Sequence, residues 1–162
     1  MSSGAVQRRS TRCLDLCQVM TAALHTFEGR CHCGALGFIL RTSKQPEQWV
    51  VRACQCSFCR GHGARTTADP DGSVTFQIAD PSKLRRYRFG TRSTDFLVCG
   101  ECGVYMAALI SSGRGQFATL NINTIRGSLG IPEPNPVSYD GESVEQRQAR
   151  REQRWTPVAE AV

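Results

Sequence analysis

The chain has 162 residues, of which 40% are hydrophobic, and this is enough for one domain with a core of its own. The longest apolar run, residues 104–110, has seven residues, well short of the ~18 needed to cross a bilayer, so no membrane span is expected. The formal net charge of +6 comes from 18 arginines and two lysines. A bias of this kind often reflects codon composition, so nucleic acid is not the expected partner.

Residues 1–25 are predicted to be a poorly ordered or weakly helical N-terminal extension. The segment is rich in arginine and serine, which is also typical of a transit peptide, and Met20 is an alternative start. Cys13 and Cys17 would share one face of a helix. We interpret them as two thiols of the extension rather than as a metal-binding pair.

Residues 26–30 are predicted to form a strand that leads into Cys31-His32-Cys33-Gly34. In an extended C-x-C sequence the two cysteines point the same way and the middle residue points away. His32 is therefore not expected to bind the same ion as Cys31 and Cys33, and it stays a candidate substrate-binding residue. Gly34 suits the positive φ that a metal knuckle often needs.

Strands are predicted next at residues 35–41 and 49–54, and the second of them leads directly into three thiols, Cys54, Cys56 and Cys59. Their C-x-C-x-x-C spacing can hold one soft metal ion, with zinc the first expectation. Three protein ligands would leave one tetrahedral position open, as in catalytic sites. A fourth ligand from elsewhere would close the site, and the spacing leaves both alternatives open.

Arg60, His62 and Arg65 follow the three thiols in a glycine-containing segment. They could meet an anionic substrate or could be solvated loop residues. Five further strands are expected after this segment: residues 74–78, 85–89, 94–98, 104–110 and 116–125. A short helix is predicted to begin at Asp80 and Pro81.

The third of these strands ends in Cys99-Gly100-Glu101-Cys102-Gly103, which has the form of a zinc knuckle. Residues 131–162 are predicted to be a Pro-rich and charged tail that adds little to the core. Within it, residues 131–136 should not form regular structure because three of the six are proline. Residues 142–154 are expected to form a short exposed helix.

Seven of the nine cysteines therefore fall into three tight clusters, which favours metal binding over disulfides and a reducing compartment, expected to be the cytoplasm. Spacing favours a group of four with a group of three: Cys31, Cys33, Cys99 and Cys102, then Cys54, Cys56 and Cys59. The rival is a zinc ribbon made of Cys56 and Cys59 with Cys99 and Cys102. It would leave three cysteines unused, and the gap between its knuckles is longer than the usual ~15–20 residues.

The three cysteine motifs lie at residues 29–35, 54–60 and 96–103. In this order they resemble the glutathione-dependent formaldehyde-activating enzyme family, which includes centromere protein V. The resemblance implies a mainly β, Mss4-like fold of small coiled antiparallel sheets organised around zinc sites, here over residues 26–130. It also implies two zinc ions per chain. The ligands would be Cys31, Cys33, Cys99 and Cys102 for a structural zinc, and Cys54, Cys56 and Cys59 for a catalytic zinc.

The resemblance further implies a zinc-dependent carbon–sulfur lyase that joins or splits a glutathione-like thiol and a formaldehyde-like aldehyde, with a homodimer as one candidate assembly. A zinc held by three thiolates suits the deprotonation of an incoming thiol, which then attacks the aldehyde. Candidate groups for the carbonyl oxygen are His32, Arg60 and His62. The carboxylates of glutathione would suit Arg52, Arg60 or Arg65.

Two other functions compete with this one. The alternative is a zinc-stabilised module that binds nucleic acid or protein without catalysis, as the centromere-associated relative suggests. A third reading is a thiol redox enzyme, because methionine sulfoxide reductases have a related fold.

Overall fold

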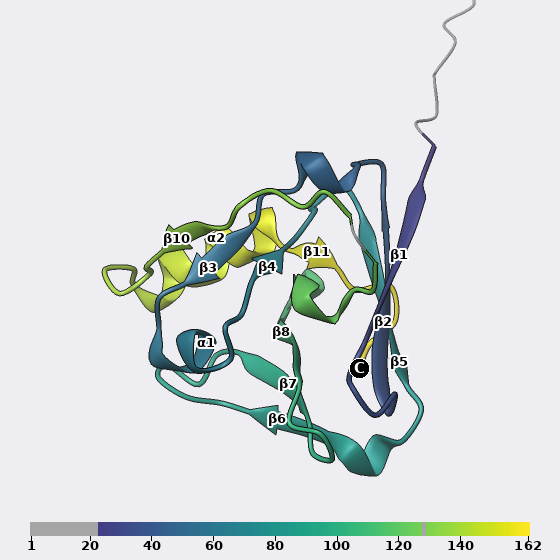
Figure 1. Cartoon of the computed structure of the whole chain (residues 1–162). Coiled ribbons are helices and arrows are strands. Elements are labelled where there is room, and N and C mark those ends of the chain that lie inside the picture. The colour runs from purple at the N-terminus through teal and green to yellow at the C-terminus, as the bar shows by residue number, and fades with distance from the viewer. Residues whose placement is uncertain (1–22, 128) are drawn as a thin grey trace, which may run out of the picture.

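The computed structural model describes residues 23–127 and 129–162, and Figure 1 shows two β-sheets with short helices around them. The smaller sheet is antiparallel and stands on the right of Figure 1. Its strands, in spatial order, are β1 (His25–Arg30), β2 (Leu36–Thr42) and β5 (Ser73–Ile78). The N-terminal extension as far as residue 22 lies outside the described residues. So do the predictions for Cys13 and Cys17 and for Met20 as an alternative start.

The larger sheet has eight strands and carries both remaining cysteine motifs. All of its pairs are antiparallel except that of β10 with β3. The mainly β fold of small sheets is therefore confirmed. The strands, in spatial order, are β10 (Asn135–Val137), β3 (Arg52–Cys54), β4 (Thr66–Thr67), β9 (Gly115–Asn121), β8 (Tyr105–Ser112), β7 (Asp95–Cys99) and β6 (Leu84–Tyr87), with β11 (Thr156–Pro157) beside β9.

The helices are short, and none that the structure describes is long and apolar enough to span a membrane. They are η1 (Pro46–Gln48), α1 (Ser57–Gly61), η2 (Pro81–Lys83), η3 (Ile122–Thr124) and α2 (Val144–Arg154). Asp80 caps η2 through the Ser82 N–H, as predicted. A capping box begins α2, because Ser143 and Gln146 each accept the other's backbone N–H.

Two clusters of buried residues fill the interior, and β8 contributes to both of them. The larger core lies where residues of the two sheets meet: Cys31, Leu36, Phe38, Leu40, Trp49, Val51, Val74, Leu97, Cys99, Met106, Ala107, Leu109, Ala118, Leu120 and Ile122. The smaller core lies against β8 as well: Cys59, Ala64, Tyr105, Ala108, Ile110, Phe117 and Trp155. Each core therefore contains cysteines of a different motif.

The tail is the part of the chain where the sequence-based expectation is wrong. Trp155 is 8% exposed and joins the smaller core, and β11 pairs with β9. The Asp69 N–H donates a 2.8 Å hydrogen bond to Thr156 Oγ1, which ties the tail to the loop before β5. The tail therefore completes the core instead of leaving it.

Residues 131–136 were expected to be irregular, yet the last two of them belong to β10. This strand lies at the edge of the larger sheet, where Pro136 is tolerated because an edge strand has one side without a ladder. The predicted strand at 49–54 is shorter than expected and begins at Arg52. The helix of the tail is α2, and it is not fully exposed because Arg151 is buried.

Candidate metal centres

The first candidate metal centre joins two tight turns that lie far apart in the sequence. Cys31 and Cys33 lie in the turn between β1 and β2, while Cys99 ends β7 and Cys102 lies in the turn before β8. We call these residues the four-cysteine group, and their Sγ atoms all lie within 4.8 Å of one another. Gly34 has φ +83°, which is the positive φ predicted for a metal knuckle.

The spacing of these sulfurs fits a tetrahedral ion. Zinc–sulfur bonds of ~2.3 Å separate the ligand sulfurs of a tetrahedron by ~3.8 Å. The Sγ atom of Cys33 lies 3.6 Å from that of Cys31 and 3.5 Å from that of Cys99. The Leu36 N–H donates to Cys31 Sγ at 3.3 Å, an orienting contact of the kind that metal ligands receive. Four converging thiols could therefore hold a metal ion with no position left open.

The second candidate metal centre is built from consecutive residues. Cys54 ends β3, Cys56 is the N-cap of α1 and Cys59 lies in the first turn of that helix. We call them the three-cysteine group, and their Sγ atoms also lie within 4.8 Å of one another. The Cys59 N–H donates to Cys56 Sγ at 3.4 Å, so the start of the helix fixes the direction of this sulfur.

Electrostatics inside the three-cysteine group favour one thiolate. The Cys59 thiol donates a hydrogen bond to the sulfur of Cys54, and this lowers the pKa of Cys54 to about 6. The same hydrogen bond, together with burial, raises the pKa of Cys59. Since thiolates are the metal-binding form of cysteine, the group is prepared for a cation at neutral pH.

A cavity of about 120 Å³ adjoins the three-cysteine group. A single water needs ~10–15 Å³ on the same measure, so there is room for a small molecule. One part of its wall is apolar and includes Phe96, Ala108 and Trp155. Tyr105 also lines it, and burial together with the nearby Cys59 raises the pKa of its hydroxyl well above the ordinary value. The Tyr105 hydroxyl therefore stays protonated and can donate a hydrogen bond.

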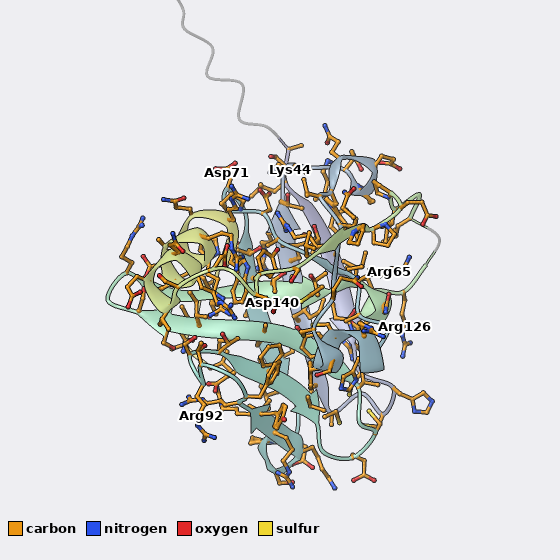
Figure 2. The ribbon with its side chains drawn as sticks, turned by 90° about the vertical axis from the view of Figure 1, so that its left-hand side faces the viewer. Lys44, Arg65, Asp71, Arg92, Arg126 and Asp140 are labelled. Atoms are coloured by element: carbon orange, nitrogen blue, oxygen red, sulfur yellow. The ribbon has the colours of Figure 1, made fainter. Side chains whose placement is uncertain are left out.

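The other part of the wall is basic and comes largely from the tail. Arg52 of β3 and three arginines of α2 line it, with Asp140 as the acidic residue. In Figure 2, Asp140 lies near the centre of the face that carries α2. The remaining basic residues of this wall are Arg147, Arg150 and Arg151. The cavity thus combines three thiols, an apolar surface and a cluster of guanidinium groups.

Residues 26–136, more than half of the chain, match the family described as "Glutathione-dependent formaldehyde-activating enzyme". The chain belongs to this family. The resemblance predicted from three cysteine motifs is therefore confirmed. Among solved structures, a crystal structure of a Rhodobacter sphaeroides protein is similar, with 26% identity and a TM-score of 0.49, and the match covers 68% of this chain and 99% of that chain. Comparison with curated proteins gives no match.

The residues that match the family, 26–136, include all seven cysteines of the two groups and end before α2. The division into four and three in the structure is the one that spacing favours. The rival zinc ribbon is not formed, because the second and third cysteine clusters belong to different groups. The two groups could hold metal ions, and the assignment of each cysteine as a zinc ligand stays a prediction.

His32, Arg60 and His62 were predicted to bind substrate, and none of them is among the described residues that line the cavity. His32 is exposed in the β1–β2 turn, and Arg60 is exposed on α1. His62 is exposed too, but its ring centroid lies 4.5 Å from that of Phe58 and 5.8 Å from that of Tyr105. The predicted roles of all three in substrate binding stay predictions.

Two further arginines were predicted to meet a carboxylate, and they lie in different places. Arg52 is half-buried and lines the cavity. Arg65 is exposed and its Nε donates to Asn123 Oδ1 at 2.7 Å. Figure 2 shows Arg65 near the right-hand edge of the face, away from Asp140.

Sequence reasoning missed Tyr105 and the arginines of α2. Tyr105 lies in an apolar strand and reads as an ordinary core residue. The arginines lie in a helix whose sequence is almost entirely polar, which predicts a solvated helix. One signal was available: Ser143 and Gln146 form a capping-box pattern and Trp155 follows the helix, and together they indicate a docked helix.

Arg85, Arg86 and Arg88, in and just after β6, differ from the arginines of the cavity wall because they do not line the cavity. Arg86 and Arg88 both pair with the carboxylate of Asp95 on β7. Arg85 Nη1 donates to the Ser82 carbonyl at 2.8 Å. These arginines thus have local partners on a solvated surface.

Proposed function

We propose that the protein is a zinc-dependent carbon–sulfur lyase that joins and splits a small thiol and a small aldehyde at the three-cysteine group. One observation carries the proposal. Among the residues that the structure describes, no further Cys, His, Asp or Glu joins the three sulfurs, and a cavity begins beside them. Three ligands with an adjoining cavity are typical of a catalytic zinc site, whereas four ligands are typical of a structural one.

The proposed cofactors are two zinc ions per chain. The four-cysteine group would hold the structural ion and so join the β1–β2 turn to the β7–β8 turn. Zinc at the three-cysteine group would be a weak Lewis acid, because three thiolates over-neutralise its charge. The chemistry it would supply is a position that binds an incoming thiol and lowers the pKa of that thiol. All seven described cysteines are free thiols, which supports a reducing compartment, and we propose the cytoplasm.

The chain's own residues would handle the aldehyde. In the joining direction the thiol sulfur forms a bond to the carbonyl carbon, and the electron pair of the broken π bond moves to the oxygen. The oxygen then takes the proton that the thiol released. We assign the hydrogen bond to this developing oxyanion to Tyr105, which lines the cavity and whose hydroxyl stays protonated.

Two further features support this assignment. The exposed His62 ring lies against Phe58 and near Tyr105, so we propose that it exchanges the proton with solvent. Phe96 and Trp155 provide apolar walls that limit the access of water to the adduct. Glutathione and formaldehyde are the first substrates to test, because they give the family its name.

The test measures exchange between free and joined substrate by NMR, with glutathione and ¹³C-formaldehyde and the zinc-loaded full chain. We expect the wild-type protein to raise the exchange rate above the uncatalysed rate. Cys56→Ser should abolish the increase, while Gln55→Ser, at the exposed position between two of the cysteines, should keep it. Equal rates with wild type and Cys56→Ser would overturn the proposal.

A further inference from the structure

The cavity beside the three-cysteine group contains more positive charge than its surroundings neutralise. Four arginines line it against one lining carboxylate, that of Asp140. Asp140 is exposed and accepts a 2.8 Å hydrogen bond from the Ser138 hydroxyl. A small cavity with this excess of cations favours an anionic occupant.

Glu142 is the nearest further acid, and it is already engaged. Arg150 Nε and Nη2 donate to the two oxygens of Glu142 at 2.7 and 2.8 Å. The guanidinium of Arg150 also lies 3.7 Å from the ring centroid of Tyr139. Arg150 therefore has its partners within the chain and is not the residue that needs an anion.

Arg147 and Arg151 differ from Arg150 because each has a buried Nε for which residues 23–127 and 129–162 offer no hydrogen-bond partner. The Nε of Arg147 lies 3.9 Å from Glu142, beyond hydrogen-bond distance, while its Nη2 donates to the Tyr139 carbonyl. Arg151 is 8% exposed, and its Nη1 donates to Ser93 Oγ at 3.1 Å. Each guanidinium is thus anchored by a hydrogen bond at one terminal nitrogen, while its Nε has no hydrogen-bond partner among the described residues.

Burial makes these cations costly. Burial, together with the neighbouring Arg150 and Arg147, lowers the pKa of Arg151 to about 10. Arg52 is half-buried in the same wall. Arginine remains charged at neutral pH in both cases, so the fold holds desolvated cations together at the cavity wall. Unpaired buried charge destabilises a protein unless a partner compensates for it.

We propose that Arg52, Arg147 and Arg151 form an anion subsite that binds a carboxylate group of the substrate held at the three-cysteine group. Guanidinium groups bind carboxylates through paired, charge-assisted hydrogen bonds. The inference rests on the proposed function for the reacting end of the substrate. Since α2 lies beyond the residues that match the family, two of the three arginines come from this chain's own tail.

The carboxylate could belong to the thiol or to the aldehyde, and paired substrates distinguish these sources. One arm compares 3-mercaptopropionate with its amide, each with formaldehyde. The other compares glyoxylate with its amide, each with 2-mercaptoethanol. We expect a preference in kcat/KM of about 10-fold to 100-fold for the acid in one arm, because charge-assisted hydrogen bonds are lost with the amide. The arm that shows it identifies the source.

Three variants locate the preference. Arg52→Gln and Arg151→Gln should reduce it to less than about 3-fold, as expected when a charge-assisted partner is lost. Arg126→Gln, at an exposed position that does not line the cavity, should leave it unchanged. If Arg151→Gln does not fold, Arg52→Gln carries the test. Loss of fold or metal lowers the rate with acid and amide alike, so the ratio reports the subsite alone.

Calorimetry with the zinc-loaded protein separates this inference from the proposed function. The probes are 3-mercaptopropionate and glyoxylate, each against its amide. Tighter binding of an acid that Arg52→Gln abolishes supports the subsite, even where no thiol–aldehyde pair is turned over and the proposed function fails. Turnover without any preference for an acid in either arm overturns the subsite and leaves the proposed function standing. Equal binding of each acid and its amide also overturns it.

Discussion

The two cysteine groups are alike in chemistry and differ in their surroundings. In the four-cysteine group, Cys31 and Cys99 are 0% and 1% exposed and belong to the larger core. In the three-cysteine group, Cys59 belongs to the smaller core, and all three members line a cavity. Thiols of the four-cysteine group therefore fill part of the packed core, whereas those of the three-cysteine group face a cavity.

The difference arises from where the ligands come from. The four-cysteine group unites two turns that are separated by most of the domain, so an ion there would cross-link the fold. The three-cysteine group comes from one strand end and the helix that follows it, so an ion there would bridge only a short loop. Cross-linking distant segments stabilises a fold more than closing a short loop.

The largest expected effect sharpens this contrast. Cys99→Ser removes a ligand from the four-cysteine group, and structural zinc binding contributes on the order of 10 kcal/mol to folding. We expect the variant to lose its cooperative thermal unfolding transition, measured by circular dichroism. Cys56→Ser should instead lose one zinc equivalent by metal analysis and keep the transition. Equal unfolding of both variants would break the distinction between the groups.

The smaller core provides the next prediction. Trp155→Ala removes a buried side chain of the tail and should lower the free energy of unfolding by about 3–5 kcal/mol, as is usual for large-to-small core substitutions. Denaturant titration measures this change. The matched control is Val144→Ala on the helix that precedes Trp155, where the side chain is 48% exposed and a change within about 0.5 kcal/mol is expected. A Trp155→Ala change as small as the control would mean that the tail is dispensable.

Tyr105→Phe tests the catalytic side of the comparison. It deletes the hydroxyl of a residue that lines the cavity, so kcat for the joining reaction should fall by about 10²-fold to 10³-fold, as when an oxyanion donor is removed. Zinc content should stay at two ions, because both candidate metal groups consist of cysteines and Tyr105 belongs to neither. An unchanged kcat would exclude Tyr105 as the oxyanion donor.

The smallest effect concerns the contact between the loop before β5 and the end of β2. Asp69 accepts hydrogen bonds from Thr42 Oγ1 and Lys44 Nζ, both at 2.5 Å. Burial alone would raise the pKa of Asp69, but the hydrogen bonds from Lys44 and Thr42 outweigh it, and the net pKa is lowered. Asp69→Asn should therefore cost about 1–3 kcal/mol at pH 7, measured by denaturant unfolding.

The pH dependence follows from the sign of that shift. Because the folded-state pKa lies below the ordinary value of ~3.9, the stabilisation is complete at neutral pH and is lost as the pH falls through the folded pKa. The stability difference between wild type and Asp69→Asn should shrink below about pH 4. A difference that stays constant down to pH 2 would contradict the assignment.

The comparison also explains what could be predicted from the sequence. The three cysteine motifs are local, so their spacing and glycines indicated the turns, the four-plus-three grouping and the family. The alternating strand residues Leu36, Phe38 and Leu40 are buried as the pattern predicted. These features depend on neighbours along the chain.

The tail could not be predicted for the opposite reason. Pattern reasoning assigns arginines to solvent, yet Arg151 is buried against Trp155 and beside Ser93, two residues far apart in the sequence. Similarly, β10 is stabilised by pairing with β3 and not by the propensity of its own residues. Such features depend on contacts that exist only in the folded chain.

X-ray absorption at the zinc edge tests the open position most directly. With both groups loaded, the account predicts an average of about 3.5 sulfur ligands per zinc without thiol. Saturating thiol substrate should raise this average to about 4, and Cys56→Ser should abolish the increase. An average of 4 before thiol is added, or no change on its addition, would contradict the account.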